Sequence, residues 1–267
     1  MRQSADQGVE VVDSRLVKLV QIVEEVGVSF ELVTGRDRPR AERFAGALGL
    51  TQGWLYFEHG AFRLDLETRR VEQLIPEYLL LPIRAFMEWV KCSNIRGWKY
   101  VTDKETMFNP MMFPDEMTLS RTAERFREQI TQEGWPLDVQ IFPGVGLDVG
   151  PKAWDKVNIV SHLGLNGDER VLYFGDSSGD KGLLADPQVI PGAPGNADPE
   201  VINLVAGRGG FISECWFGEG VISIILDLAR SGVLVNGAQI LERYWADVRD
   251  TRERRFALGH PLAASAV

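Results

Sequence analysis

The chain has 267 residues, enough for one large domain or for a body with a smaller insert. Its 38 acidic residues against 29 lysines and arginines give a net charge of −9, which excludes the basic surface of a general nucleic-acid binder. Hydrophobic residues make up 45% and charged residues 25%, the balance of a folded globular protein, so disordered, collagen-like and coiled-coil classes are also excluded.

The cysteines and histidines do not form a metal or disulfide pattern. Cys92 and Cys215, like His59, His162 and His260, are scattered without the spacing of a zinc site or a disulfide scaffold. We expect both thiols to be buried and reduced. The first residues lack the apolar run of a signal peptide, and no run of about 18 apolar residues follows. The sequence therefore predicts a cytoplasmic protein that does not act at a membrane.

The first predicted elements alternate between helix and strand. Apolar residues from Leu16 to Val26 recur every three or four positions, behind Asp13 as a cap and before Gly27 as a stop, which indicates an amphipathic helix. The elements that follow are a strand at 28–33, a helix at 39–48 and a strand at 54–57. This order is typical of a parallel sheet with crossover helices.

The alternation stops near residue 74 and resumes after residue 145. Between these points the sequence predicts a helix at 79–90, a Met- and Pro-rich segment at 107–117, a helix at 119–133 and a strand at 137–142. We interpret residues 75–145 as an inserted α+β cap domain. The core then comprises residues 1–74 and 146–235 and belongs to the α/β class, with a Rossmann-like parallel sheet.

The second half of the core again alternates. It is predicted to contain a helix at 154–163, a strand at 171–174, a helix from about residue 180, a strand at 188–190, and helices at 199–206 and 220–231. Residues 236–267 are predicted to form a charged C-terminal helix followed by a solvated tail without chemistry.

Ligands of an open parallel sheet bind beyond the carboxyl ends of its strands. Thr34, Gly35 and Arg36 follow the strand at 28–33 and offer a hydroxyl, a flexible backbone amide and a cation, which together suit a phosphoryl group. The alternative is a plain strand-to-helix turn. Residues 58–61, Glu-His-Gly-Ala, follow the next strand, where a histidine on a turn is more often structural than catalytic.

Two aspartates follow the apolar strand at 171–174. Asp176 and Asp180 are four residues apart and can meet over one Mg²⁺ ion held with waters and phosphate oxygens. The alternative makes Asp180 a residue that begins a helix. Lys156, at the start of the helix at 154–163, either neutralises a phosphoryl group or lies on the surface. Asn196 contributes to the site or belongs to a turn.

Residues 175–179 also match Gly-x-Ser-x-Gly, the nucleophile-elbow pattern, with Ser177 as the exposed serine. A serine triad would need a histidine further along the chain, and His260 in the C-terminal tail is the one available. The sequence contains no Walker loop and no Gly-x-Gly-x-x-Gly fingerprint, so a nucleotide-binding fold of those kinds has little support.

In their order, these motifs resemble the haloacid-dehalogenase (HAD) superfamily of phosphatases, in the branch with a large C2-type cap between the second and third motifs. That branch includes Cof-type phosphatases, phosphomannomutase, mannosyl-3-phosphoglycerate phosphatase and sucrose-phosphatase. Residues 34–36 resemble the second motif, 58–61 the Glu-Asn-Gly-Ala after it, 154–156 the third-motif lysine, 175–180 the acidic fourth motif, and 195–197 with 218–221 the closing segment. The fourth motif departs from the family at Gly179, where asparagine is usual. The resemblance covers residues 12–232.

The resemblance implies Mg²⁺-dependent hydrolysis of a small phosphate monoester, such as a sugar phosphate or a phosphoglycerate conjugate. By the matched motifs, Thr34 and the Gly35 amide would bind the transferring phosphoryl group and Lys156 would stabilise it. Asp176 and Asp180 would hold the metal ion. The resemblance extends substrate binding to Arg36 and Asn196. The glycine at position 179 removes one polar contact near the metal, so weaker Mg²⁺ binding is expected.

One family motif is missing. In this superfamily the nucleophile and the general acid are the two aspartates of an N-terminal Asp-x-Asp-Gly-Thr loop that ends the first strand. Asp6 and Asp13 lack the preceding apolar strand and the Gly-Thr, so neither receives these roles. We therefore expect the chain as it stands to be inactive or impaired, and its sheet to have two strands with unpaired backbone groups.

Three explanations of the missing loop remain open. In the first, which we favour because the other motifs persist, the chain begins at an internal methionine just after the loop. In the second, it is a phosphatase-like protein that binds a phosphorylated ligand or serves as a scaffold without turnover. In the third, a partner chain, including a second copy in a homo-oligomer, supplies the strand.

Overall fold

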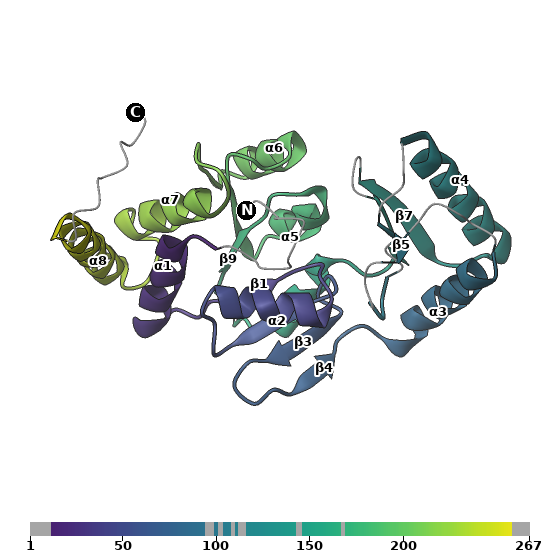
Figure 1. Ribbon diagram of the computed structural model, residues 1–267, viewed down its shortest axis with the longest axis horizontal. Helices are drawn as coiled ribbons and strands as arrows, with labels where there is room; N and C mark the ends of the chain where they lie inside the picture. Colours follow the sequence, from purple (N-terminus) through teal and green to yellow (C-terminus); the bar gives the residue numbers. More distant parts are fainter. Residues whose placement is uncertain are drawn as a thin grey trace.

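The computed structural model describes residues 12–93, 99–100, 104–107, 110–111, 116–142, 146–166 and 169–257. It consists of a larger body and a smaller inserted body, joined by two connecting segments (Figure 1). The larger body contains the elements before residue 74 and after residue 155, and the smaller one contains those between. This arrangement confirms the predicted α/β class with an inserted α+β cap.

Two separate sheets form the core. The first has the order β1 (Leu32–Val33), β2 (Trp54–Phe57), β3 (Phe62–Asp65) and β4 (Val71–Gln73). Its β1 and β2 are parallel, whereas β3 and β4 continue it as an antiparallel hairpin. The second sheet is fully parallel and has the order β11 (Phe211–Ile212), β10 (Val189–Ala193) and β9 (Val171–Phe174). Within these described strands, β1 and β9 are both edge strands, and no backbone hydrogen bonds pair them.

Helices cover both faces of the core. One apolar cluster joins α1 (Ser14–Glu25), α2 (Arg38–Ala47) and α7 (Phe217–Arg230) to Leu55 and Phe57 of β2. The alternate residue Tyr56 points into a second cluster with η1 (Lys156–His162), a 3₁₀ helix, and α5 (Lys181–Ala185). Next to it, α6 (Pro199–Gly207) packs on β10. Coverage of both faces is the usual arrangement for parallel strands.

The inserted body has its own core. Helices α3 (Glu77–Cys92) and α4 (Glu116–Glu133) pack on an antiparallel sheet of order β5 (Lys99–Tyr100), β6 (Pro110–Met111), β8 (Gly146–Pro151) and β7 (Leu137–Phe142). Phe86 of α3 and Phe126 of α4 meet edge to face with ring centroids 5.1 Å apart. The domain boundary predicted at residue 145 falls between β7 and β8, which are neighbours in this sheet.

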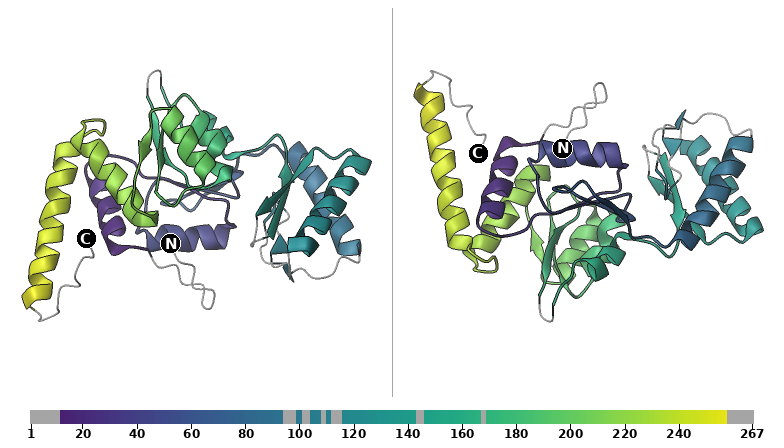
Figure 2. Two further views of the ribbon diagram at one scale, coloured as in Figure 1. Left: turned by 90° about the horizontal axis from the view of Figure 1, so that it is seen from above. Right: turned by 90° about the horizontal axis from the view of Figure 1, so that it is seen from below.

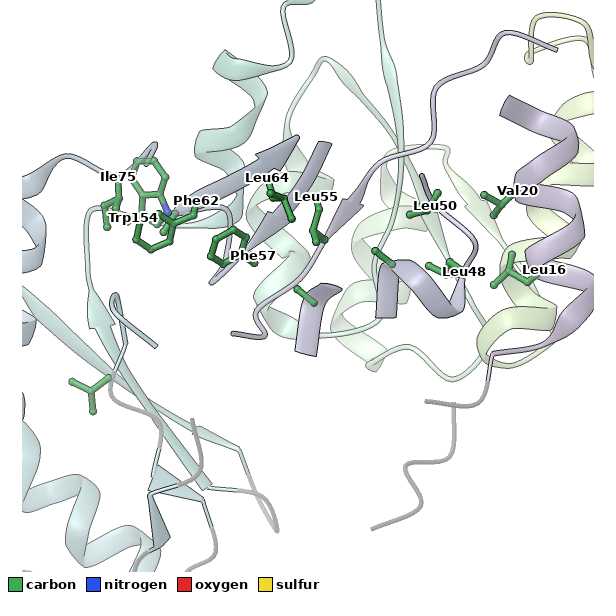
Figure 3. Close-up of a cluster of buried hydrophobic side chains, with 14 of the residues drawn as sticks. Leu16, Val20, Leu48, Leu50, Leu55, Phe57, Phe62, Leu64, Ile75 and Trp154 are labelled. Atoms are coloured by element: carbon green, nitrogen blue, oxygen red, sulfur yellow. The ribbon is translucent and has the colours of Figure 1, made fainter. Parts of the chain in front are cut away.

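A continuous line of buried side chains runs along the core to the insert. Figure 3 follows it from Leu16 of α1 through Leu55 and Leu64 of the first sheet to Ile75 and Trp154. Ile75 and Trp154 lie on the two segments that connect the bodies, and both are at most 9% exposed. The connections are therefore packed as part of the core.

The C-terminal helix belongs to the core body. Helix α8 (Gly237–Ala257) lies beside α1 and α7 (Figure 2) and buries Ile240 and Tyr244 in the main cluster. Asn236 anchors its start by donating from Nδ2 to the Val26 carbonyl at 2.8 Å. The predicted helix is present, and its first half is packed. Residues 258–267 of the predicted tail lie outside the described residues.

Several sequence expectations need correction. The strand predicted at 28–33 is reduced to Leu32–Val33, because only these residues pair with β2 and their other edge is open. The β3–β4 hairpin, β8 and β11 were not predicted, and η1 is a 3₁₀ helix. Both cysteines are exposed, since Cys92 ends α3 and Cys215 lies in the loop before α7. Among the described residues, no helix has the length and apolarity to cross a bilayer.

Candidate functional site

The residues after β1 and β2 form one turn assembly. The Thr34 amide donates to the Tyr56 carbonyl, and the His59 amide donates to the Thr34 carbonyl, each at 3.0 Å. A side chain at position 35 would place its Cβ 2.5 Å from His59 Nε2, so only glycine lets the imidazole lie against this backbone. Positive φ angles of 48° at Glu58 and 58° at His59 make the turn that brings the imidazole there.

Lys156 and Asp180 form a buried ion pair. Lys156 Nζ lies 2.6 Å from Asp180 Oδ1, and the two side chains are only 9% and 5% exposed. Tyr173 of β9 donates its hydroxyl to the same oxygen at 2.6 Å. The surface alternative for Lys156 is therefore wrong: its backbone starts η1, and η1 packs against Tyr56 in the second cluster.

Asp180 also organises the turn after β9. Its Oδ2 accepts from the amides of Asp176 and Ser177, at 3.2 and 3.1 Å, and from Ser177 Oγ at 3.0 Å. The Asp198 amide then donates to the Asp176 carbonyl at 2.9 Å. Asp176 is thereby fixed beside the ion pair and is accessible to solvent. For the serine-hydrolase alternative, the structure shows that Ser177 Oγ donates to the Asp180 carboxylate, as a helix-capping serine does. The histidine of that alternative, His260, lies outside the described residues.

The two halves of the site meet at His59. Charges of Lys156 and Asp180 both act on its imidazole, which itself lies against Gly35. His59 therefore contacts the turn after β1 and is close enough to the Lys156–Asp180 pair to feel its charges. Five predicted residues from distant parts of the sequence lie at the carboxyl ends of β1 and β9: Thr34 and Gly35 follow β1, Asp176 and Asp180 follow β9, and Lys156 pairs with Asp180.

Arg36 and Asn196 make other contacts. The Arg36 guanidinium lies over the Phe44 ring of α2, 4.8 Å from its centroid. Asn196 Oδ1 accepts from the Phe217 amide at 2.6 Å and so holds the start of α7. Between the described residues, no hydrogen bond joins Asn196 to the other predicted site residues. The observed hydrogen bond of Asn196 is thus the one expected of a turn residue, and a role in the site stays a prediction.

Burial and neighbouring charges shift the carboxyl groups in opposite directions. Desolvation would raise the pKa of Asp180, but Lys156, Tyr173 and the Ser177 amide outweigh it and hold the pKa below its usual value. Desolvation and the adjacent Asp180 carboxylate raise the pKa of Asp176. Asp180 is therefore the stably ionised member of the pair, while Asp176 is the more basic carboxylate.

The Glu58 carboxylate connects the core to the insert. Glu58 Oε2 accepts from the amides of Glu105 and Thr106 at 2.9 Å and from Thr106 Oγ1 at 2.8 Å. Asp148 of β8 approaches from the same side, with Oδ2 3.8 Å from His59 Nε2. The insert therefore covers the turn that carries His59. Sequence reasoning missed the contributions of Tyr173, Asp148 and the insert, because none lies in a recognisable motif.

His59 gives a pH-dependent prediction. Burial, Lys156 and Lys104 lower its pKa well below the ordinary value, so the fold favours the neutral imidazole. Its contribution to stability is complete above the unfolded pKa of about 6.5 and is lost as the pH falls below that value towards the folded pKa. In urea unfolding, the free-energy difference between wild type and His59→Gln should shrink from about pH 7 to about pH 5. A difference that is independent of pH would contradict this account.

A Mg²⁺ ion fits this site through one carboxylate. Both Asp180 oxygens already accept hydrogen bonds, five in all, from Lys156, Tyr173, Asp176 and Ser177. Across the described ranges, no three His, Cys, Asp or Glu side chains are grouped as a metal site. Mg²⁺ in phosphate sites commonly uses one or two carboxylates with waters and phosphate oxygens. Asp176, the accessible carboxylate, meets that minimum.

No protein-family model matches the sequence, and no curated protein matches it significantly. Solved structures are similar. A protein of Thermoplasma acidophilum has a TM-score of 0.62 at 17% identity, over 80% of this chain and 89% of that one. Sucrose-phosphatase from Synechocystis, solved with sucrose and phosphate, has a TM-score of 0.60 at 19% identity, over 80% and 91%. A haloacid dehalogenase-like hydrolase from Bacteroides thetaiotaomicron has a TM-score of 0.60 at 15% identity, over 79% and 90%.

At these identities the similarity concerns the fold. Each matched structure is covered over about nine-tenths of its length, so the match includes both the parallel core and the inserted body. This chain therefore has the fold of the haloacid-dehalogenase phosphatases, a Rossmann-like α/β core with an inserted cap.

Proposed function

We propose that this chain binds the phosphoryl group of a small phosphate monoester, such as a sugar phosphate, at the ends of β1 and β9. The observation that carries the proposal is the buried Lys156–Asp180 pair, whose charges act on His59, the residue that lies against Gly35. A lysine fixed beside an accessible aspartate and a glycine backbone suits an anion and a divalent cation together. The similarity to a sucrose-phosphatase fold supports the sugar-phosphate class.

Each residue has a role in this proposal. The Thr34 hydroxyl and the Gly35 amide donate to phosphoryl oxygens, and Lys156 neutralises their charge. Asp180 acts chiefly by fixing the Lys156 ammonium through its 2.6 Å contact, and Asp176 holds the Mg²⁺ ion. The ion would supply positive charge to the phosphoryl oxygens as the leaving-group bond lengthens.

The reaction class of the proposed site is Mg²⁺-dependent hydrolysis, which requires a nucleophile beside the phosphoryl group. Carboxylate attack on phosphorus needs an aspartate between Thr34 and Asp176. In the part of the chain that the structure describes, no strand lies between β1 and β9, and neither edge carries such a residue. This observation favours a second candidate function, in which the chain binds a phosphorylated ligand or acts as a scaffold without turnover.

Calorimetric titration with inorganic phosphate, with and without Mg²⁺, tests the binding proposal. We expect wild type to bind phosphate, Mg²⁺ to strengthen that binding about tenfold, and Asp176→Asn to abolish the strengthening. Asp186→Asn is the matched control, because Asp186 follows α5 and, between the described residues, its carboxylate accepts only from the local Gln188 amide. If phosphate fails to bind the wild-type chain, the proposal is wrong.

Turnover of an aryl phosphate separates the two candidate functions. Activity that depends on Mg²⁺ and is abolished by Asp176→Ala would reject the non-catalytic candidate. Phosphate binding without turnover would support it. The serine-hydrolase alternative would gain support only if an esterase activity were present and Ser177→Ala destroyed it.

A further inference from the structure

Lys104 of the insert is a buried cation that no described residue contacts by a hydrogen bond or an ion pair. The residue is only 6% exposed, and among the described residues its ammonium has neither a hydrogen bond nor an ion pair. The following two residues, Glu105 and Thr106, are bonded to Glu58 of the core. Lys104 is therefore held at the junction where the insert covers the candidate site.

The charged groups that act on Lys104, and on which it acts, belong to the candidate site and its surroundings. Its charge acts on His59 together with the charge of Lys156, and His59 lies against Gly35. The carboxylates whose charges favour the ammonium are Asp148, Glu58 and Asp37, and the Arg40 guanidinium opposes it. The site thus has one cation from the core, Lys156, and a second from the insert, Lys104.

The two cations differ in how they are satisfied. Lys156 is paired with Asp180 at 2.6 Å. Near Lys104, by contrast, the carboxylates have other partners. Glu58 Oε2 already accepts three hydrogen bonds from residues 105 and 106. The Asp37 carboxylate accepts a hydrogen bond from the Arg40 amide at 3.0 Å and lies 3.6 Å from Nε of the Arg40 guanidinium. Burial disfavours the Lys104 ammonium, and no described carboxylate forms an ion pair with it, so an anion bound beside it would offset the cost of its desolvation.

We propose that Lys104 binds a second anionic group of the substrate, a carboxylate or a second phosphate, while the transferring phosphoryl group lies at Gly35 and Lys156. The inference rests on the proposed function and specifies its substrate class: an acidic phosphorylated sugar or sugar acid with two separate anionic groups.

Calorimetric titration of the full chain with four ligands tests this inference. The ligands are inorganic phosphate, glucose 6-phosphate, glucose 1,6-bisphosphate and 3-phosphoglycerate. We expect at least one ligand with two anionic groups to bind wild type about tenfold more tightly than glucose 6-phosphate. The bisphosphate reports a second phosphate as the preferred group, and 3-phosphoglycerate reports a carboxylate.

Variants then assign the preference to Lys104. Lys104→Met should reduce the tenfold preference to twofold or less while leaving the affinity for inorganic phosphate within about twofold. Lys104→Gln should behave in the same way. Lys152→Met is the matched control, because Lys152 is an exposed lysine in the segment after β8, and it should keep the full preference. Unchanged phosphate binding also shows that the variants are folded.

Failure of the inference is distinct from failure of the proposed function. If wild type binds phosphate but does not prefer any ligand with two anionic groups, the role of Lys104 is refuted and the phosphoryl site stands. If Lys104→Met weakens inorganic phosphate as much as the other ligands, the second-group assignment is also refuted. If no phosphate compound binds wild type, both proposals fall.

Discussion

Replacement of Lys156 by methionine is expected to lower the free energy of unfolding by about 3–5 kcal/mol, because it leaves a buried carboxylate without its cation. Asp180 is only 5% exposed on its side chain, and its partner contact is 2.6 Å long. Methionine retains most of the side-chain length and removes the charge, so the effect reports the ion pair and not a large cavity. Phosphate binding should also be lost.

Urea unfolding at neutral pH measures this effect. Lys181→Met is the matched control: its pair with Glu200 has the same 2.6 Å distance, but the side chains are 43% and 73% exposed. Its loss should therefore be small. The double variant Lys156→Met/Asp180→Asn should regain part of the stability, since the buried charge is removed. Equal losses for the Lys156 and Lys181 variants would refute the importance of burial.

The pH dependence of the same variant has a defined sign. The pKa of Asp180 is lowered in the fold, so its contribution is present above the unfolded pKa of about 3.9 and is lost as the pH falls through the folded value. The deficit of Lys156→Met should therefore be largest near neutral pH. It should diminish as the pH falls towards about 4, because the unpaired buried carboxylate becomes protonated in the variant, and further below about 4, where the wild type loses the contribution of its own Asp180 carboxylate.

A strand supplied between β1 and β9 is expected to have the largest effect on turnover. We would extend the chain ahead of Met1 with an apolar strand that ends in Asp-x-Asp-Gly-Thr. A parallel strand at that place would deliver its last residues between Thr34 and Asp176, and it would pair both open edges. Because loss of a nucleophile lowers turnover about a million-fold in triad hydrolases, we expect a gain of about that order on an aryl phosphate.

An extension with asparagine in place of the first aspartate separates sheet completion from chemistry. Both extensions should raise the midpoint of thermal unfolding, because each pairs the edges of β1 and β9. Only the aspartate version should restore turnover. If neither extension changes stability or turnover, then these edges do not accept a strand and the proposed role of the gap is wrong.

Local sequence patterns predicted the elements with strong periodicity. The strands at Trp54–Phe57, Leu137–Phe142 and Val171–Phe174 have the predicted bounds, and Asp13 caps α1 as expected by accepting from the Arg15 amide. The short strands β8 and β11 were missed. Their residues, rich in glycine or only two in number, have weak local preference and become strands through their neighbours β7 and β10.

In the candidate site, too, local sequence predicted some features and the tertiary structure decided others. The order of its motifs in the sequence predicted where Thr34, Lys156, Asp176 and Asp180 would fall relative to the strands. Taken singly, Lys156 resembled a surface lysine, and only the packing of η1 on the core buries it against Asp180. Asn196, which the resemblance assigns to the site, accepts a hydrogen bond at the start of α7, and its part in substrate binding stays a prediction.

The sequence by itself determined the α/β class, the insert and the residue types at the strand ends, because these depend on periodicity and short-range order. The tertiary structure decided which charges are buried, which are paired, and which residues of the insert reach the core, as Glu58 and Lys104 show. Burial and pairing depend on side chains far apart in the chain, and the energy of a charge is set by those neighbours and not by its own residue type.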